Sequence, residues 1–174
     1  MQTLDHDEVT LSINASPDVV YALVSDVTRT PEFSPEIIDC RWLDGATGPA
    51  VGARFQAQNR TSPSRPSWSN TPVVTVADPG REFAFSRTEK FAGTIVWRYL
   101  LEPEGNRTRV TESYTVVKPV RRVGWFIIEK VFGNLDRRSD LRSGMQETLR
   151  RLSAAAENDH PAASSQPGSH NAVT

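Results

Sequence analysis

The strongest constraint on the fold lies in residues 94–116, TIVWRYLLEPEGNRTRVTESYTV. Two runs in this region, 94–103 and 108–117, alternate large apolar residues with polar ones, and a short Glu-Gly-Asn turn joins them. Alternation with a period of two is typical of half-buried β-strands, and a short glycine-containing connection between two such runs indicates a hairpin. The chain is therefore expected to contain an antiparallel pair of strands with one face directed to an interior.

The inward face of this hairpin combines aromatic residues with a carboxylate. Alternation places Trp97 and Tyr99 on one face of the first strand, and Glu112 and Tyr114 on one face of the second. We assign both faces to the interior. Buried tyrosine and tryptophan usually need a hydrogen-bond partner, and Glu112 could be that partner. A carboxyl group in an apolar pocket has a raised pKa and can act as an acid or a base.

Two simpler interpretations stay open for the same residues. Trp97 and Tyr99 can be bulky core residues and nothing more. Glu112 can face water and pair with Arg98 or Arg109 across the strands, because a single β-bulge reverses the face on which a residue lies. The sequence favours neither orientation of Glu112.

Two other expected strands carry further candidate ligand-binding residues. Phe55 and Asn59 share one face of the first, and Phe83 and Phe85 alternate on the second. They line either a cavity or a plain core. Asn59 and Arg87 lie at strand ends, where they can bind a polar head group or be solvated.

The rest of the chain predicts an α+β order of elements. A strand within 8–16 is followed by a helix within 16–26, for which Ser16 is a suitable N-cap and Pro17 a suitable first residue. Two prolines restrict the next stretch to a turn or a very short helix. The further strands before the hairpin are expected at 37–43, 53–60, 73–77 and 82–87. The polar segment 61–72 is a loop or a frayed strand start.

From about Pro119 the apolar spacing becomes helical and predicts one long helix to about residue 157. Its run 135–142 is interpreted as a solvated face with local ion pairs. An antiparallel sheet of about seven strands with one wet face must cover the other face, and this helix is the obvious cover. Residues 158–174 are rich in Pro, Ser and Asn and are predicted to be a disordered tail behind a domain of residues 1–157.

The long helix and the segment before the strand at 73–77 add candidate ligand-binding residues. Trp125, Glu129 and Phe132 fall toward one side of the helix. They can line a cavity, or form a core stripe with Glu129 on its border. Trp68, in the segment before the strand at 73–77, is the last candidate ligand-binding residue.

Composition excludes several classes of function. The net charge is −1, with 20 basic and 21 acidic residues, so nucleic acid is not an expected partner. The histidines are His6, His160 and His170, all near the ends of the chain, so neither a histidine base nor a histidine metal site is expected. No metal and no cofactor are predicted. The single cysteine, Cys40, cannot form a disulfide within the chain. Without a signal peptide or a run of ~20 apolar residues, no membrane span is expected, and the default location is cytoplasmic.

Three stretches give the chain a family resemblance. They are INASPDVVYALVSD at 13–26, Trp68 with VVTVADPGREFAFS at 73–86, and GTIVWRYLLEPEGNRTRVTESY at 93–114. With the order of elements, they resemble the START-like, or SRPBCC, helix-grip superfamily, in its polyketide cyclase/dehydrase-like branch, over residues 8–157. The resemblance implies a curved antiparallel sheet wrapped around the long C-terminal helix. It also implies a cavity between sheet and helix for a hydrophobic or amphipathic small molecule.

Three functions follow as expectations. The first is binding of a lipid-like, polyketide-like or aromatic molecule by a monomer or homodimer. The second is a cyclase or dehydratase activity, with Glu112 as acid or base and Tyr99 or Tyr114 as hydrogen-bond donors. The third is a co-chaperone-like protein interaction module, which predicts an exposed apolar patch instead of an enclosed cavity.

Overall fold

The computed structural model of the protein describes residues 4–89, 93–119 and 136–159. Within these ranges the chain forms eight β-strands, three short helices and one long helix. The strands are β1 (His6–Ile13), β2 (Ile37–Trp42), β3 (Phe55–Asn59), β4 (Trp68–Asn70), β5 (Val73–Asp78), β6 (Glu82–Glu89), β7 (Gly93–Glu104) and β8 (Arg107–Lys118). The helices are α1 (Pro17–Ser25), the 3-10 helix η1 (Val27–Arg29), α2 (Thr30–Phe33) and α4 (Arg137–Asp159).

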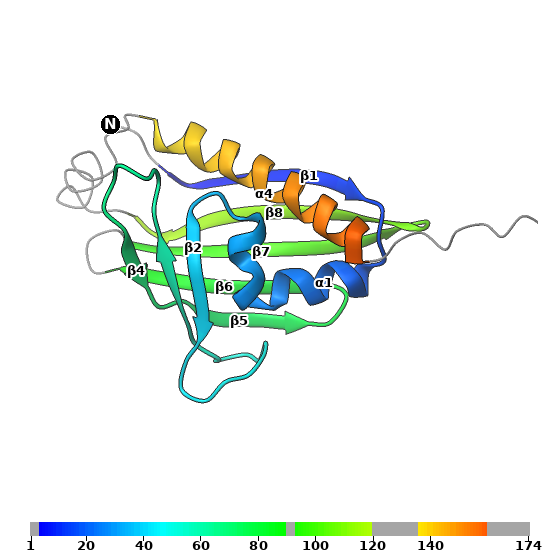
Figure 1. Ribbon diagram of the computed structural model, residues 1–174, viewed down its shortest axis with the longest axis horizontal. Helices are drawn as coiled ribbons and strands as arrows, with labels where there is room; N and C mark the ends of the chain where they lie inside the picture. Colours follow the sequence, from blue (N-terminus) through cyan, green and yellow to red (C-terminus); the bar gives the residue numbers. More distant parts are fainter. Residues whose placement is uncertain (1–3, 90–92, 120–135, 160–174) are drawn as a thin grey trace, which may run out of the picture.

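The strands confirm the predicted antiparallel arrangement. Five strands form a sheet in the order β1-β8-β7-β6-β5, and three form a second sheet in the order β2-β3-β4. A backbone bridge between Arg54 and Val73 joins the two sheets, and β2 runs across the direction of the five strands (Figure 1). The strand beyond the predicted seven is β4, which lies in the segment where the sequence allows a loop or a frayed strand.

The hairpin of β7 and β8 forms as predicted. Its register places Trp97 opposite Tyr114 and Tyr99 opposite Glu112. The ladder shifts only between Thr94 and Ile95, so the alternation of faces is continuous through the rest of β7. The two faces assigned to the interior therefore do point inward.

The short helices between β1 and β2 cover part of the inner face. The Ser16 hydroxyl accepts a hydrogen bond from the Val19 backbone N–H, which caps α1, and Pro17 is its first residue. Pro31 lies in the first turn of α2, where its missing N–H costs nothing. The buried ring of Phe33, at the end of α2, packs into the core.

The long helix α4 covers the same face of the sheet. It packs against β1, β8, α1 and α2, and Figure 1 shows it crossing in front of β1 and β8. Leu141, Met145, Leu149 and Leu152 recur at helical spacing along α4 and are buried. The predicted helix began near Pro119, but residues 120–135 lie outside the described ranges.

The helix α4 extends past the boundary predicted at residue 157. It includes Asn158 and ends at Asp159, whose carboxylate is 2.7 Å from the Arg29 guanidinium. That ion pair joins the last turn of α4 to the short helices. Residues 160–174 lie outside the described ranges. None of the described helices is long and apolar enough to cross a membrane.

Candidate functional site

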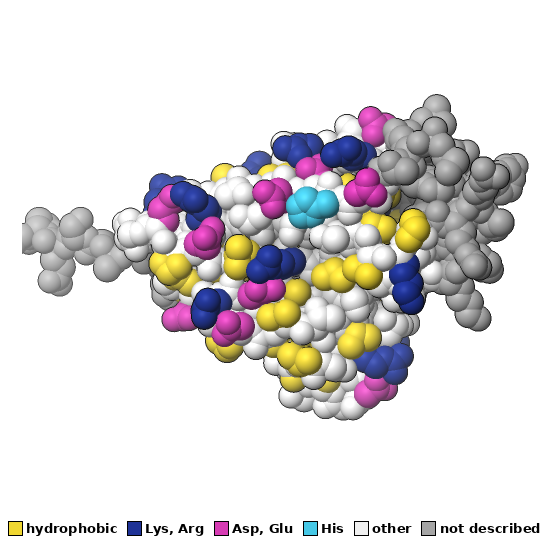
Figure 2. All heavy atoms as spheres, turned by 180° about the vertical axis from the view of Figure 1, so that it is seen from behind, with side chains coloured by type: hydrophobic (Ala, Val, Ile, Leu, Met, Phe, Trp, Pro, Cys, Tyr) yellow, Lys and Arg dark blue, Asp and Glu magenta, His cyan; other side chains and the backbone are white. Residues whose placement is uncertain are grey.

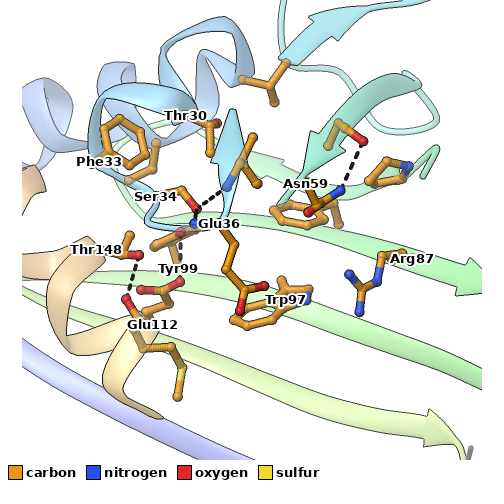
Figure 3. A pocket seen from close by; sticks show the side chains of 18 of the residues that line it. Thr30, Phe33, Ser34, Glu36, Asn59, Arg87, Trp97, Tyr99, Glu112 and Thr148 are labelled. Atoms are coloured by element: carbon orange, nitrogen blue, oxygen red, sulfur yellow. Dashed lines mark hydrogen bonds between the residues drawn. The ribbon is translucent and has the colours of Figure 1, made fainter. Parts of the chain in front are cut away.

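A cavity opens between the inner face of the five-stranded sheet, the segment from α1 to β2, strands β3 and β4, and α4. Its volume is about 100 Å³. Figure 3 shows lining side chains that come from the strands, from the segment around α2 and from α4. These elements are far apart in sequence, so only the folded chain brings the lining together.

Aromatic rings form one wall of the cavity. Phe83 is fully buried, and its ring lies 5.9 Å from that of Phe85. The Phe85 ring meets Phe55 of β3 edge to face at 5.2 Å, which is a favoured geometry for aromatic pairs. Trp97 lines the same space from β7. The structure therefore brings together these four residues, which the sequence singled out as candidates.

A hydrogen-bonded pair from the hairpin lies in the cavity wall. Glu112 is 4% exposed and Tyr99 is 7% exposed. The Tyr99 hydroxyl donates a hydrogen bond of 3.0 Å to Oε1 of Glu112. Oε2 of Glu112 is buried and has no hydrogen-bond partner among the described residues. One carboxyl oxygen of Glu112 thus remains available to a molecule in the cavity.

Burial controls the protonation of this pair. It raises the pKa of Glu112 to about 8, although the hydrogen bond from Tyr99 acts in the opposite direction. Burial also raises the pKa of Tyr99 well above its ordinary value, and the nearby Glu112 adds to that rise. At neutral pH the pair is therefore a carboxylic acid beside a neutral phenol, and the acid has a proton to donate.

The alternative orientation of Glu112 is wrong. The two arginines proposed as its solvent-side partners bind other carboxylates, because both lie on outward-facing positions. Arg98 forms two hydrogen bonds of 2.8 Å with Glu82, and Arg109 forms one of 2.9 Å with Glu104. No bulge interrupts β7 or β8 near Glu112, so its side chain keeps the inward direction that strict alternation gives.

Two candidate residues lie beside the cavity and not on its wall. Tyr114 is 1% exposed and packs in a core cluster with Leu141 and Met145, its ring 5.6 Å from that of Trp97. Its hydroxyl is buried without a hydrogen-bond partner in the described ranges. Trp68 lies on β4 opposite Asn59 and is half-buried. The cavity lining therefore includes Tyr99 but neither Tyr114 nor Trp68.

An ion pair that the sequence did not indicate lies between the cavity and a neighbouring surface groove. Arg137, at the start of α4, donates hydrogen bonds of 2.6 and 2.9 Å to the two carboxylate oxygens of Glu36. Both residues line the cavity and also the groove. Burial alone would raise the pKa of Glu36, but the hydrogen bonds and charge of Arg137 outweigh it and lower that pKa.

Local hydrogen bonds fix the segment that carries Glu36. The Ser34 hydroxyl accepts from the backbone N–H of Ile37 at 3.2 Å, and the Glu36 carbonyl accepts from the backbone N–H of Arg60 at 2.8 Å. On α4, Arg137, Leu141 and Thr148 recur at helical spacing and face the cavity. That spacing is the one signal in the sequence that could have placed Arg137 on the inner face.

The polar strand-end residues are less solvated than the sequence suggested. Asn59 is 4% exposed, and its amide donates a hydrogen bond of 3.1 Å to the Ala57 carbonyl. The Arg87 side chain is 18% exposed and lines the cavity. Figure 3 shows Arg87 on the far side of Trp97 from Glu112.

The candidate residues Trp125, Glu129 and Phe132 lie outside the described ranges. Within those ranges, no group of three His, Cys, Asp or Glu side chains could hold a metal ion. Cys40 is buried and free, and burial raises its thiol pKa to about 12. The described wall of the cavity supports apolar contacts through its aromatic rings, hydrogen bonding and proton transfer at Glu112, and ionic contacts at Arg87.

Comparisons with known proteins agree with this geometry. A family model described as polyketide cyclase / dehydrase and lipid transport matches residues 6–157. The Polyketide_cyc-like protein Cgl2372 from Corynebacterium glutamicum is 32% identical, with a TM-score of 0.59, over 95% of this chain and 99% of that chain. A search among curated proteins gave no match.

Two more distant solved structures share the fold. The ZhuI aromatase/cyclase from Streptomyces sp. R1128 is 18% identical, with a TM-score of 0.64, over 94% of this chain and 99% of that chain. A START superfamily protein from Mycobacterium smegmatis is 15% identical, with a TM-score of 0.65, over 90% of this chain and 100% of that chain. At these identities the likeness is one of fold, and it matches the helix-grip arrangement predicted from the sequence.

Proposed function

The chain belongs to the polyketide cyclase/dehydrase and lipid transport family, and we propose that it binds a hydrophobic or amphipathic small molecule, of lipid, polyketide or aromatic type, in the cavity beneath α4. The observation that carries this proposal is an apolar, aromatic-lined cavity with a buried carboxyl oxygen that lacks a partner in the described part of the chain. Ligand pockets typically combine such an apolar lining with a few polar groups that fix orientation. Burial of apolar ligand surface supplies the affinity, at ~25 cal/mol per Å².

Native mass spectrometry of the purified protein, before and after gentle extraction with organic solvent, tests this proposal. We expect an adduct of a few hundred daltons that extraction removes, because a ligand buried on most sides leaves slowly. The mass and fragmentation of the extract then define the chemical class of the ligand. A protein that stays free of adducts, and that also fails to take up any member of a panel of fatty acids, polyphenols and fused-ring aromatics, would contradict the proposal.

A second function, a cyclase or dehydratase activity, is favoured by the protonated state of Glu112. In a dehydration, the Glu112 carboxylic acid gives its proton to the leaving hydroxyl, which departs as water when the C–O bond breaks. The carboxylate that remains takes the proton from the neighbouring carbon, and the C=C bond forms. Tyr99 holds Oε1 of Glu112, so Oε2 faces the reacting molecule. A residue with a pKa of about 8 is well placed for both steps near neutral pH.

Replacement of Glu112 by Gln tests this second function. Gln keeps the shape and can still accept the Tyr99 hydrogen bond, but it cannot transfer a proton. We expect turnover of a polyketide-like hydroxyketone to fall by about 10²–10⁴-fold, the usual contribution of a general acid or base. Ligand affinity should change much less. Turnover equal to that of the wild type, with the fold intact by circular dichroism, would exclude Glu112 as the proton carrier.

The third expectation, a co-chaperone-like interaction module, has less support. It requires a contiguous exposed apolar patch. In the described ranges, the large apolar residues with marked exposure are Leu11, Ile38, Val51 and Val117, and they come from four separate segments. On the face opposite to that of Figure 1, hydrophobic side chains alternate with charged ones (Figure 2).

A further inference from the structure

Arg87 is a mostly buried cation that makes no side-chain hydrogen bond to any residue the structure describes. Its side chain is 18% exposed, and its nearest anionic partner is Glu89, with Nε 3.4 Å from Oε1. That Oε1 atom is itself buried without a hydrogen-bond partner in the described part of the chain, so the contact is an ion pair and not a hydrogen bond. A guanidinium group carries five N–H donors in a planar fork that matches a carboxylate. Burial of such a group without hydrogen bonds is costly, so it is a good docking point for a ligand anion.

Among the described residues, the other charged side chains near the cavity do not prevent Arg87 from binding such a ligand. Glu36 is fully engaged by Arg137 through two hydrogen bonds, so that pair adds little net charge. Glu112, the other carboxyl group in the described part of the wall, is held in its neutral form by burial at neutral pH. Glu89 is the anionic side chain with the largest effect on Arg87, ahead of Glu36, and it acts through a long contact on the more exposed end of β6. An incoming carboxylate would therefore meet an attractive field, not a repulsive one.

The sheet register gives the spacing of the two polar positions. Phe83, Tyr99 and Glu112 lie in one row across β6, β7 and β8, and Arg87 pairs with Ile95 four residues farther along β6. Along the strands this offset is roughly 13 Å, and across two strands it is roughly 10 Å. Figure 3 shows Arg87 and Glu112 on opposite sides of Trp97. The cavity thus has a cationic end and a neutral hydrogen-bonding end, with aromatic rings between them.

We propose that Arg87 binds a carboxylate of the ligand, and that the ligand is an amphipathic organic acid with an aromatic or acyl body. This inference rests on the proposed binding function and adds the charge and orientation of the ligand. The acid group lies at Arg87, the apolar body lies against Phe85 and Trp97, and a carbonyl or hydroxyl group of the ligand meets Oε2 of Glu112.

A matched pair of probes tests the proposal. The probes are 2-naphthoate and 2-naphthamide, which share ring and shape and differ by one negative charge. Their dissociation constants are measured by isothermal titration calorimetry at pH 7 on the wild type, on Arg87→Met and on Arg87→Lys. The control is Arg81→Met, because the Arg81 side chain is 79% exposed and lies 3.8 Å from its partner Asp78. This control measures any general attraction of the anion to surface arginines.

We expect the wild type and Arg81→Met to bind 2-naphthoate about tenfold more tightly than 2-naphthamide. A charge-assisted bidentate contact between Arg87 and the carboxylate provides a preference of this size. Arg87→Met should bring the two affinities within a factor of about three, and Arg87→Lys should keep part of the preference. If Arg87→Met fails to fold, the ratio of the acid and amide affinities in the wild type and in Arg87→Lys still tests the role of Arg87. Binding of both probes with equal affinity to the wild type, or a preference that survives in Arg87→Met, would overturn the role of Arg87 and leave the binding function intact. Binding of neither probe would overturn an aromatic acid as the ligand, and the mass-spectrometric test and ligand panel described above then decide the binding function separately.

Discussion

Between pH 5 and pH 8, the free energy of unfolding of the wild type is expected to fall relative to that of Glu112→Gln by about 1.4 kcal/mol per pH unit. The total difference over this window is roughly 4 kcal/mol. Typical domains unfold with only about 5–15 kcal/mol, so this single buried group governs a large part of the stability. Denaturant unfolding at four pH values, followed by tryptophan fluorescence, measures the effect.

The sign follows from the direction of the pKa shift. Burial raises the pKa of Glu112 from its ordinary value of 4.5 to about 8 in the folded protein. Between these two values the folded state keeps a proton that the unfolded state releases. Each rise in pH therefore favours the unfolded state, until the carboxyl group is ionised in both states above about pH 8. The amide that replaces this carboxyl group in Glu112→Gln cannot ionise, so the variant lacks this contribution.

Glu104→Gln is the matched control for this measurement. Glu104 lies at the turn of the same hairpin, where hydrogen bonds from Ser12 and then Arg109 lower its pKa below the ordinary value. A lowered carboxyl pKa contributes stability that is lost only as pH falls toward the acid range, so this variant should follow the wild-type slope from pH 5 to pH 8. Parallel curves for the wild type and Glu112→Gln would mean that Glu112 is ionised in the fold, which would remove the basis for a neutral acid in the cavity.

The hairpin shows why much of the fold could be predicted from the sequence. Strand alternation is a local property, and the Glu-Gly-Asn turn fixes the pairing, so the inward direction of Trp97, Tyr99 and Glu112 follows once no bulge intervenes. The capped start of α1 is equally local, since Ser16 and Pro17 satisfy or remove the first backbone donors. The family resemblance then supplied the global arrangement, because no local pattern tells which helix covers a sheet.

The charged residues of the site could not be predicted, because their burial depends on contacts between residues far apart in the sequence. Arg137 falls in the run 135–142, which was interpreted as a solvated face, and for this residue that interpretation was wrong. Its 8% exposure depends on Glu36, which lies about 100 residues earlier in the chain and forms a bidentate pair with it. A long-range ion pair leaves no periodic signal. The burial of Arg87 could not be predicted from the sequence either. A residue at a strand end is buried only if other parts of the chain pack against it, and its own sequence neighbours do not determine that.

The pair of Glu36 and Arg137 makes a second strong prediction. Replacement of Arg137 by Met should lower the free energy of unfolding by about 3 kcal/mol, because it leaves the Glu36 carboxylate partly buried without its two hydrogen bonds. Glu36→Met should have a similar effect, since the Arg137 side chain is only 10% exposed. The double variant Glu36→Met/Arg137→Met should lose far less than the sum, because no uncompensated charge remains. Urea unfolding of the wild type, the two single Met variants and the double variant gives the coupling energy directly.

The exposed pair of Arg109 and Glu104 provides the comparison that makes this cycle informative. Its two side chains are 53% and 41% exposed, so the same cycle there should give a much smaller coupling energy, because water screens both charges. A coupling at Glu36 and Arg137 no larger than that would mean that water reaches both groups. In that case the pair would not close the cavity toward the groove that both residues also line.

A large coupling energy between Glu36 and Arg137 would place a desolvated ion pair between the cavity and the groove. Any ligand that enters from the groove must then break the two hydrogen bonds between these residues. Ligand exchange on that route should then become faster in the double variant, by about tenfold for each ~1.4 kcal/mol that the pair adds to the barrier.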